Sequence, residues 1–200
     1  MDEEVAGAFE SAVSALRAQG HDVARVEMPD AVPSSELIDA IGEEVSRAHR
    51  EFRARGEHYD PAVSSRIEIA EGVTAEATAR ARDWQTMIRS RFSDVFQSVD
   101  LLITPTTPAR RKVIGDDMIG EKSHRTVLSY FSALVNHALH PALAAPLAGT
   151  AAAGVPPASL QAIGPLRSEM LLVTFGHSLV AAGIARFEAP APNPPNPGGE

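Results

Sequence analysis

The stretch that decides the fold is Asp100-Leu101-Leu102-Ile103-Thr104-Pro105-Thr106-Thr107-Pro108. An acid is followed by three aliphatic residues, and threonines and prolines close the stretch. A short apolar run without polar alternation is typical of a strand covered on both faces, as in a parallel sheet. Proline cannot donate to a strand ladder, so it ends such a strand. The stretch predicts a buried strand near residues 101–104.

Further segments on both sides of this strand complete an alternating pattern. Two more buried strands are predicted at 142–147 and at 159–163, and the alternation of residues 22–28 predicts a short strand after the first helix. Apolar residues at helical spacing predict helices within residues 1–20, 33–55, 61–72, 74–98 and 123–137, and from 168 onward. Helices that alternate with buried strands indicate the α/β class.

Composition limits the kinds of protein this chain can be. Its 200 residues are 44% hydrophobic and 22% charged, which fits one domain with a core of ordinary size. With 18 basic and 26 acidic side chains the net charge is −8, so the sequence predicts neither a nucleic-acid nor a membrane-surface partner. The absence of cysteine excludes a disulfide framework, a thiol nucleophile and cysteine-ligated zinc within this chain.

The two ends of the sequence differ in composition. The start, Met1-Asp2-Glu3-Glu4, is acidic where a secretory signal is basic and then apolar. No apolar run approaches the roughly 18 residues of a membrane-spanning helix, and we expect a cytoplasmic protein. Residues 189–200 contain five prolines, which predicts a disordered tail after a domain at 1–188.

One serine stands in a segment that resembles a catalytic motif. Gly176-His177-Ser178-Leu179-Val180 begins like the elbow that carries the nucleophile of α/β-hydrolases. Val180 replaces the second glycine of that elbow, and no histidine or aspartate follows Ser178. Position 178 also falls within a helical period. We therefore expect Ser178 to pack on a helix and assign no catalytic residue in this chain.

Other polar groups have structural explanations as well as functional ones. His137 and His140 could share a helix face as metal ligands, with His124 or Asp117 as a third ligand, but histidines before a proline are more often structural. Glu43-Glu44 and Asp116-Asp117 are pairs of adjacent carboxylates. Adjacent residues on a helix point apart, so neither pair is expected to share a proton as a catalytic dyad. The run Arg110-Arg111-Lys112 is expected to be solvated loop surface. No glycine-rich phosphate loop occurs, so neither a cofactor nor a metal is predicted.

Three stretches together resemble the C-terminal half of the amidase signature family. The first is 100–108; the second runs from Asn136 through Pro141-Ala142-Leu143 to Pro146; the third includes Gly154-Val155-Pro156, 160–165 and Glu169. The order and spacing of the motifs carry the resemblance, which spans about residues 3–188. It implies a mixed, mostly parallel sheet covered by helices on both faces.

The resemblance also implies where this chain departs from the family. Leu139 stands where the Asn-x-x-Gly-x-Pro pattern has glycine, and Pro157 lies in a segment that is one residue longer than usual. The family's lysine and two serines lie in its N-terminal half, and no residue here maps onto them. The two lysines, Lys112 and Lys122, have no Gly/Ser-rich segment beside them. Without nucleophile, base and oxyanion loop, the chain alone has no route to acyl transfer.

The preferred hypothesis is the C-terminal part of an amidase-type hydrolase, without its catalytic half. The complete enzyme would cleave the C–N bond of a small amide through an acyl-serine, and this part would supply a wall of the substrate cleft. Its partner would be the missing N-terminal half or a second copy of the chain. The alternative is a non-catalytic binding or assembly module derived from the same fold. The predicted cleft-wall residues are Thr104, Thr106, Ser129, Phe131, Asn136 and Gln161.

Overall fold

The computed structural model describes residues 1–28, 36–152 and 155–187. Within them a first helix is followed by a run of three helices, then by a mixed region of short strands and helices, and by a final helix. In chain order these are α1 (Glu3–Ala18), α2 (Glu36–Ala54), α3 (Pro61–Glu71), α4 (Ala75–Val95), β1 (Leu102–Pro105), β2 (Met118–Ile119), β3 (Lys122–Ser123), α5 (His124–Leu128), α6 (Tyr130–Ala138), β4 (Ala142–Pro146), β5 (Ser159–Ile163) and α7 (Glu169–Ala181).

The main sheet has β5 at its centre, with β1 and β4 on its two sides. Both pairings are antiparallel, and Gln161 lies opposite Thr104 on one side and Ala144 on the other. The predicted α/β class is confirmed. The described strands do not pair in parallel, however, because β5 runs opposite to both of its neighbours. The strands β4 and β5, consecutive in the chain, are neighbours in the sheet and run in opposite directions.

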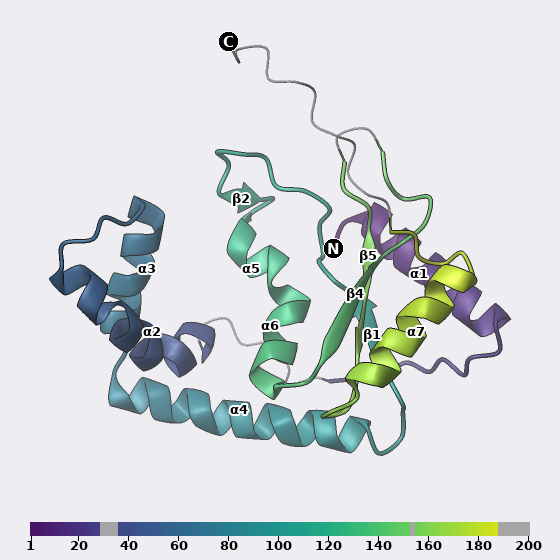
Figure 1. Ribbon diagram of the computed structural model, residues 1–200, viewed down its shortest axis with the longest axis horizontal. Helices are drawn as coiled ribbons and strands as arrows, with labels where there is room; N and C mark the ends of the chain where they lie inside the picture. The colour runs from purple at the N-terminus through teal and green to yellow at the C-terminus, as the bar shows by residue number, and fades with distance from the viewer. Residues whose placement is uncertain (29–35, 153–154, 188–200) are drawn as a thin grey trace, which may run out of the picture.

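Each face of this sheet has its own hydrophobic core, because successive residues of β5 point to opposite faces. Leu160 and Ala162 pack with residues of α1 and α7, whereas Ile163 packs with Ile88 and Phe92 of α4 and with α6. Figure 1 shows α1 and α7 on one side of the sheet and α6 on the other, with α4 running beneath. The cover of helices on both faces is thus confirmed.

The predicted strand at residues 22–28 is wrong. The described part, which ends at Met28, has no regular secondary structure. Val23 packs against the core shared by α1 and α7, and its carbonyl accepts a hydrogen bond from Arg17 at 2.9 Å; Met28 packs against the opposite core. A strand needs a neighbour to complete its ladder, and the described residues supply none for this segment. Its apolar residues Val23, Val26 and Met28 are partly buried without one.

The helical run predicted at 123–137 is interrupted. It forms α5 and α6, with Ser129 as the C-cap of the first and the N-cap of the second, and the Ser129 hydroxyl donates to the Arg125 carbonyl at 2.7 Å. Residues 33–35, where the second helix is predicted to begin, and the tail at 189–200 lie outside the described residues. None of the described helices combines the length and the hydrophobicity of a membrane-spanning segment.

Arg110 is not the solvated loop residue that the sequence indicated. Its side chain is only 11% exposed, and its Nη1 forms an ion pair with Glu4 Oε2 at 2.8 Å. Its Nε donates to the Pro156 carbonyl at 3.0 Å, and its Nη2 donates to the Thr150 carbonyl. Arg111, by contrast, is exposed. One guanidinium therefore joins α1, the segment after β1 and the β4–β5 connection.

Candidate functional site

Gln161 and Thr104 form a polar pair on the sheet face opposite to α1 and α7. Gln161 is 5% exposed, and its amide nitrogen donates to Thr104 Oγ1 at 3.3 Å; that hydroxyl donates to the Pro105 carbonyl at 2.9 Å. The antiparallel register places the two side chains side by side on neighbouring strands. The structure brings these two predicted cleft residues together and gives the buried glutamine the partner that it needs.

Thr106 lies just past the end of β1, next to this pair. Its backbone N–H donates to the Ser159 carbonyl at 2.9 Å, which extends the β1–β5 ladder by one residue. Its hydroxyl oxygen is buried and has no hydrogen-bond partner among the described residues. A buried hydroxyl without a partner costs free energy, so this is a place where an added group could form a hydrogen bond.

The remaining predicted cleft residues lie elsewhere. Ser129 occupies the α5–α6 junction, and Phe131 on α6 packs edge-on against Tyr130 with ring centroids 5.0 Å apart. Asn136 lies near the end of α6, by the start of β4. The six predicted residues therefore come from two parts of the fold. Thr104, Thr106 and Gln161 belong to β1, its end and β5, whereas Ser129, Phe131 and Asn136 belong to the α5–α6 segment.

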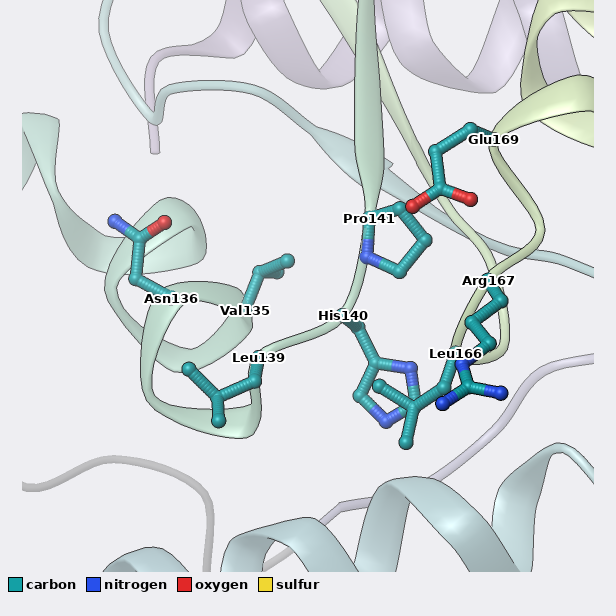
Figure 2. A pocket seen from close by; sticks show the side chains of 8 residues that line it. All are labelled: Val135, Asn136, Leu139, His140, Pro141, Leu166, Arg167 and Glu169. Carbon is teal, nitrogen blue, oxygen red and sulfur yellow. The ribbon is translucent and has the colours of Figure 1, made fainter.

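Asn136 lines a pocket of about 480 Å³ between the end of α6 and the start of α7. Figure 2 shows it on one side of the pocket, with Arg167 and Glu169 on the other and His140 below Pro141. The complete lining is Val135, Asn136, Leu139, His140, Pro141, Leu166, Arg167 and Glu169. The sequence offers no reason to select Arg167, and it marks Glu169 only as part of the third stretch of the family resemblance, not as a site residue.

The two histidines considered as metal ligands have separate structural partners. His140 stacks on Phe92 with ring centroids 5.1 Å apart, and its Nδ1 lies 2.9 Å from the Gly164 carbonyl. His137 is 7% exposed, and its Nδ1 lies 2.7 Å from the Gln85 side-chain nitrogen. Within residues 1–28, 36–152 and 155–187 no group of three potential ligands lies close enough to hold a metal ion.

The pKa of His137 is lowered in the folded chain, so folding favours its neutral form. Burial lowers its pKa below the ordinary value, and the positive charge of Arg89 lowers it further. Because an amide nitrogen can only donate, Nδ1 of His137 accepts from Gln85, and protonation there would break this hydrogen bond. The unfolded imidazole takes up a proton that the folded one resists, so acid favours unfolding.

We therefore expect the free energy of unfolding to fall as the pH decreases below about 6.5, the ordinary pKa of histidine. His137→Gln should flatten that part of the stability profile, because the titrating group is gone. The exposed His58 is the matched control: His58→Gln should leave the slope unchanged. Urea denaturation at several pH values between 5 and 8 measures the free energy of unfolding and therefore the slope. Equal slopes in wild type and His137→Gln would contradict the conclusion that folded His137 resists protonation.

Ser178 lies within α7, as its helical period indicated, but it is not the packed position that the sequence predicted. It is exposed, and its hydroxyl donates to the Phe175 carbonyl at 2.7 Å, within the helix. Gly176 faces the sheet instead: a methyl group added there would lie 2.7 Å from Leu143 Cδ2 of β4. The glycine of this segment thus permits close helix–strand packing and does not form a nucleophile elbow.

Two residues of the pocket have a left-handed backbone that favours glycine. Leu139, the C-cap of α6, has φ 62° and ψ 27°, and Arg167 has φ 67°. A helix commonly ends in this conformation, and glycine adopts it without the steric cost that Cβ adds. The backbone at Leu139 has therefore kept the glycine-type turn although the side chain is leucine.

Leu139→Gly should stabilise the chain by roughly 0.5–1 kcal/mol, because strain is relieved while a side chain already 64% exposed loses little contact. Leu166 is a matched control, since it is 62% exposed and its φ is not positive. Leu166→Gly should give no gain. Urea midpoints of the two variants make the comparison; equal shifts would mean that strain at Leu139 is not the cause.

Comparisons with known proteins agree with this geometry. The Amidase family model matches residues 1–173. The 2-amino-5-chloromuconic acid deaminase of Comamonas testosteroni is 28% identical over 205 residues, covering 95% of this chain and 43% of that protein. A glutamyl-tRNA(Gln) amidotransferase subunit of Afipia carboxidovorans is 31% identical over 153 residues, which are 74% of this chain and 30% of the relative.

Solved structures show the same fold. A crystal structure of an amidase superimposes with a TM-score of 0.80 at 22% identity, covering 89% of this chain and 42% of the amidase. The substrate complex of 6-aminohexanoate cyclic dimer hydrolase superimposes with a TM-score of 0.70 at 24% identity, covering 91% and 42%. This chain thus spans less than half the length of the proteins that it matches. It belongs to the amidase family.

Proposed function

We propose that this chain forms the C-terminal part of an amidase-type hydrolase that breaks an amide C–N bond through an acyl-serine. The catalytic lysine and serines would come from a catalytic portion equivalent to the rest of the relatives, on the same polypeptide or on another. The observation that carries the proposal is the family match over residues 1–173, together with coverage of only 43% of the Comamonas relative.

The positions of the two lysines support the view that this part is inactive alone. Lys112 Nζ lies 3.7 Å from Asp117 Oδ1, and Lys122 is exposed in the β2–β3 hairpin. No serine is buried among residues 1–28, 36–152 and 155–187, so neither lysine has there a buried serine that it could activate, as catalysis by this family would require. The proposed role is therefore to complete the sheet and to form part of the cleft wall.

Gln161 and Thr104 are the proposed centre of that wall. Both are held on strands by the β1–β5 register, and Thr106 adds a buried hydroxyl without a partner among the described residues. Amide and hydroxyl groups are suited to bind a small amide through its carbonyl and N–H groups. Asn136, Ser129 and Phe131 stay predicted wall residues on α6 and at its start.

A chimera tests the proposal. This chain replaces the matching portion of the Comamonas testosteroni deaminase, and the chimera is assayed for the reaction of that parent. We expect the chain alone to be inactive and the chimera to turn over substrate. Gln161→Leu should lower the chimera's activity at least tenfold, whereas Gln97→Leu, at an exposed glutamine, should not. Amide hydrolysis by the chain alone, abolished by a serine substitution in it, would contradict the proposal.

The second candidate function is a binding or assembly module without catalysis. In this role two copies of the chain would pair with each other. The exposed apolar side chains of α7 favour an interaction surface but do not distinguish this candidate from the first. A folded but inactive chimera would favour the module. A cytoplasmic location and self-association stay predictions.

A further inference from the structure

The pocket between the end of α6 and the start of α7 contains two strained backbone positions. Among the residues that the structure describes, Leu139 and Arg167 are the two non-glycine residues with positive φ, at 62° and 67°. This conformation costs an L-residue roughly 1–2 kcal/mol. Residues held in it gather at sites that bind ligands. Both of them line this one pocket, which we call the α6–α7 pocket, so the strain singles out this place in the fold.

Two unpaired charges of opposite sign lie on one side of the α6–α7 pocket. Arg167 and Glu169 are exposed, and Figure 2 shows both facing Asn136 across the pocket. Within residues 1–28, 36–152 and 155–187 neither side chain forms an ion pair or a hydrogen bond, although the two are only two positions apart. The fold therefore leaves a guanidinium and a carboxylate open to a ligand that carries the opposite charges.

His140 adds a fixed hydrogen-bond acceptor to the same pocket. Its ring stacks on Phe92 and contacts Phe96, with ring centroids 5.1 and 5.0 Å apart. Its Nδ1 lies 2.9 Å from the Gly164 carbonyl, which can only accept, so Nδ1 carries the proton of the neutral ring. The other nitrogen, Nε2, is then an acceptor. An acceptor of this kind, together with the carboxylate of Glu169, is suited to an ammonium group.

Apolar side chains complete the lining between the charged groups. Leu139 is 64% exposed and Leu166 is 62% exposed, and Val135 and Pro141 also line the pocket. The volume of about 480 Å³ falls within the range of roughly 300–1,000 Å³ that is usual for small-molecule sites. A ligand with an aliphatic chain would remove part of this apolar surface from water.

The α6–α7 pocket is separate from the proposed centre of the cleft wall. Thr106 binds the Ser159 carbonyl at one end of β5, whereas Leu166 follows Ile163 at the other end. Four residues of strand separate Ser159 from Ile163, which is about 13 Å at 3.3 Å per residue. A ligand in this pocket would therefore be bound in addition to the substrate of the complete enzyme.

We propose that the α6–α7 pocket binds a small aliphatic amino carboxylate. Arg167 pairs with the carboxylate of this ligand, and Glu169 and His140 bind its ammonium group. The two exposed leucines contact the aliphatic chain between these groups. This assignment goes beyond the proposed function, because it adds a second binding site and does not depend on the reaction of the complete enzyme.

Titration calorimetry of the whole chain tests the class of ligand. The probe is 6-aminohexanoate, and hexanoate and hexylamine are the matched probes that keep the chain but carry one charge each. We expect 6-aminohexanoate to bind with a Kd of about 1 mM or less. Each single-charge probe should bind about tenfold more weakly, because one charge-assisted contact is lost. Equal binding of hexanoate or hexylamine would overturn the proposal, since the pocket would then select a single charge.

Substitutions at the two charges test which residue binds which group. Arg167→Gln should weaken 6-aminohexanoate about tenfold without weakening hexylamine, and Glu169→Gln should do the same without weakening hexanoate. Both positions are exposed, so the variants should fold like wild type. The matched controls are Arg111→Gln and Glu10→Gln, at exposed charges outside the pocket lining. Equal weakening by the controls would mean diffuse ion binding and would overturn the assignment.

Nuclear magnetic resonance of the histidine rings locates the bound ligand. Addition of 6-aminohexanoate should shift the ring signals of His140 and leave those of the exposed His58 in place. Binding that leaves the His140 signals unchanged would show that the ligand lies elsewhere. The absence of saturable binding would refute the site itself.

Discussion

Replacing Gly176 by valine should destabilise the chain by about 3 kcal/mol, because a branched side chain would be forced between α7 and β4. Even the first carbon of that side chain would lie 2.7 Å from Leu143 Cδ2, closer than real contacts allow. Either Leu143 must leave its place in the core or the helix must move off the strand. The urea midpoint of Gly176→Val measures the loss.

Two substitutions identify the cause. Gly176→Ala should change stability by less than about 1 kcal/mol, because the terminal methyl of Leu143 can turn aside and alanine favours the helix. Ser178→Val puts the same branched side chain two residues along, where the helix is exposed, and should have a small effect. Equal losses at 176 and 178 would point to helix propensity and refute close packing.

Arg110→Met should cost about 3 kcal/mol, since it breaks an ion pair and two charged hydrogen bonds at a largely buried side chain. The carbonyls of Thr150 and Pro156 would lose their donors, and Glu4 would lose its counter-charge. Methionine keeps much of the apolar stem. The expected loss of stability therefore comes from the guanidinium contacts, and thermal denaturation measures this loss.

The neighbouring cation supplies the control. Arg111→Met removes the same charge from an exposed side chain and should change stability by less than about 0.5 kcal/mol. Arg110→Lys keeps the charge but loses the fork that reaches three acceptors, and should lie between the two. If Arg110 and Arg111 behave alike, the contacts of Arg110 add nothing to stability.

Much of the fold was predictable because the signals were local. The apolar run at 101–104 and the period of α4 identify elements within a few residues of β1 and α4. Strand direction was not predictable, because antiparallel pairing depends on which strand lies in the middle of the sheet. The failed strand at 22–28 has the right alternation but no described neighbour to pair with.

The candidate site was predictable only in part. Gln161 stood out as a polar residue within an apolar strand, and the register brought it to Thr104 as a partner. Arg110 could not be told from Arg111, since burial is decided by loops that are distant in the sequence. Leu139 was visible as a departure from a glycine pattern, but only the backbone reveals that the left-handed turn persists.

The central position of β5 has a consequence for synthesis on the ribosome. Both cores depend on residues 159–163, which lie more than 50 residues after β1 and about 140 after α1. Until this segment leaves the exit tunnel, α1 and β1 have no sheet to pack on. Contacts so distant along the chain fold slowly and leave apolar surface exposed meanwhile. The nascent chain should therefore bind holdase chaperones up to about residue 163 and release them soon afterwards.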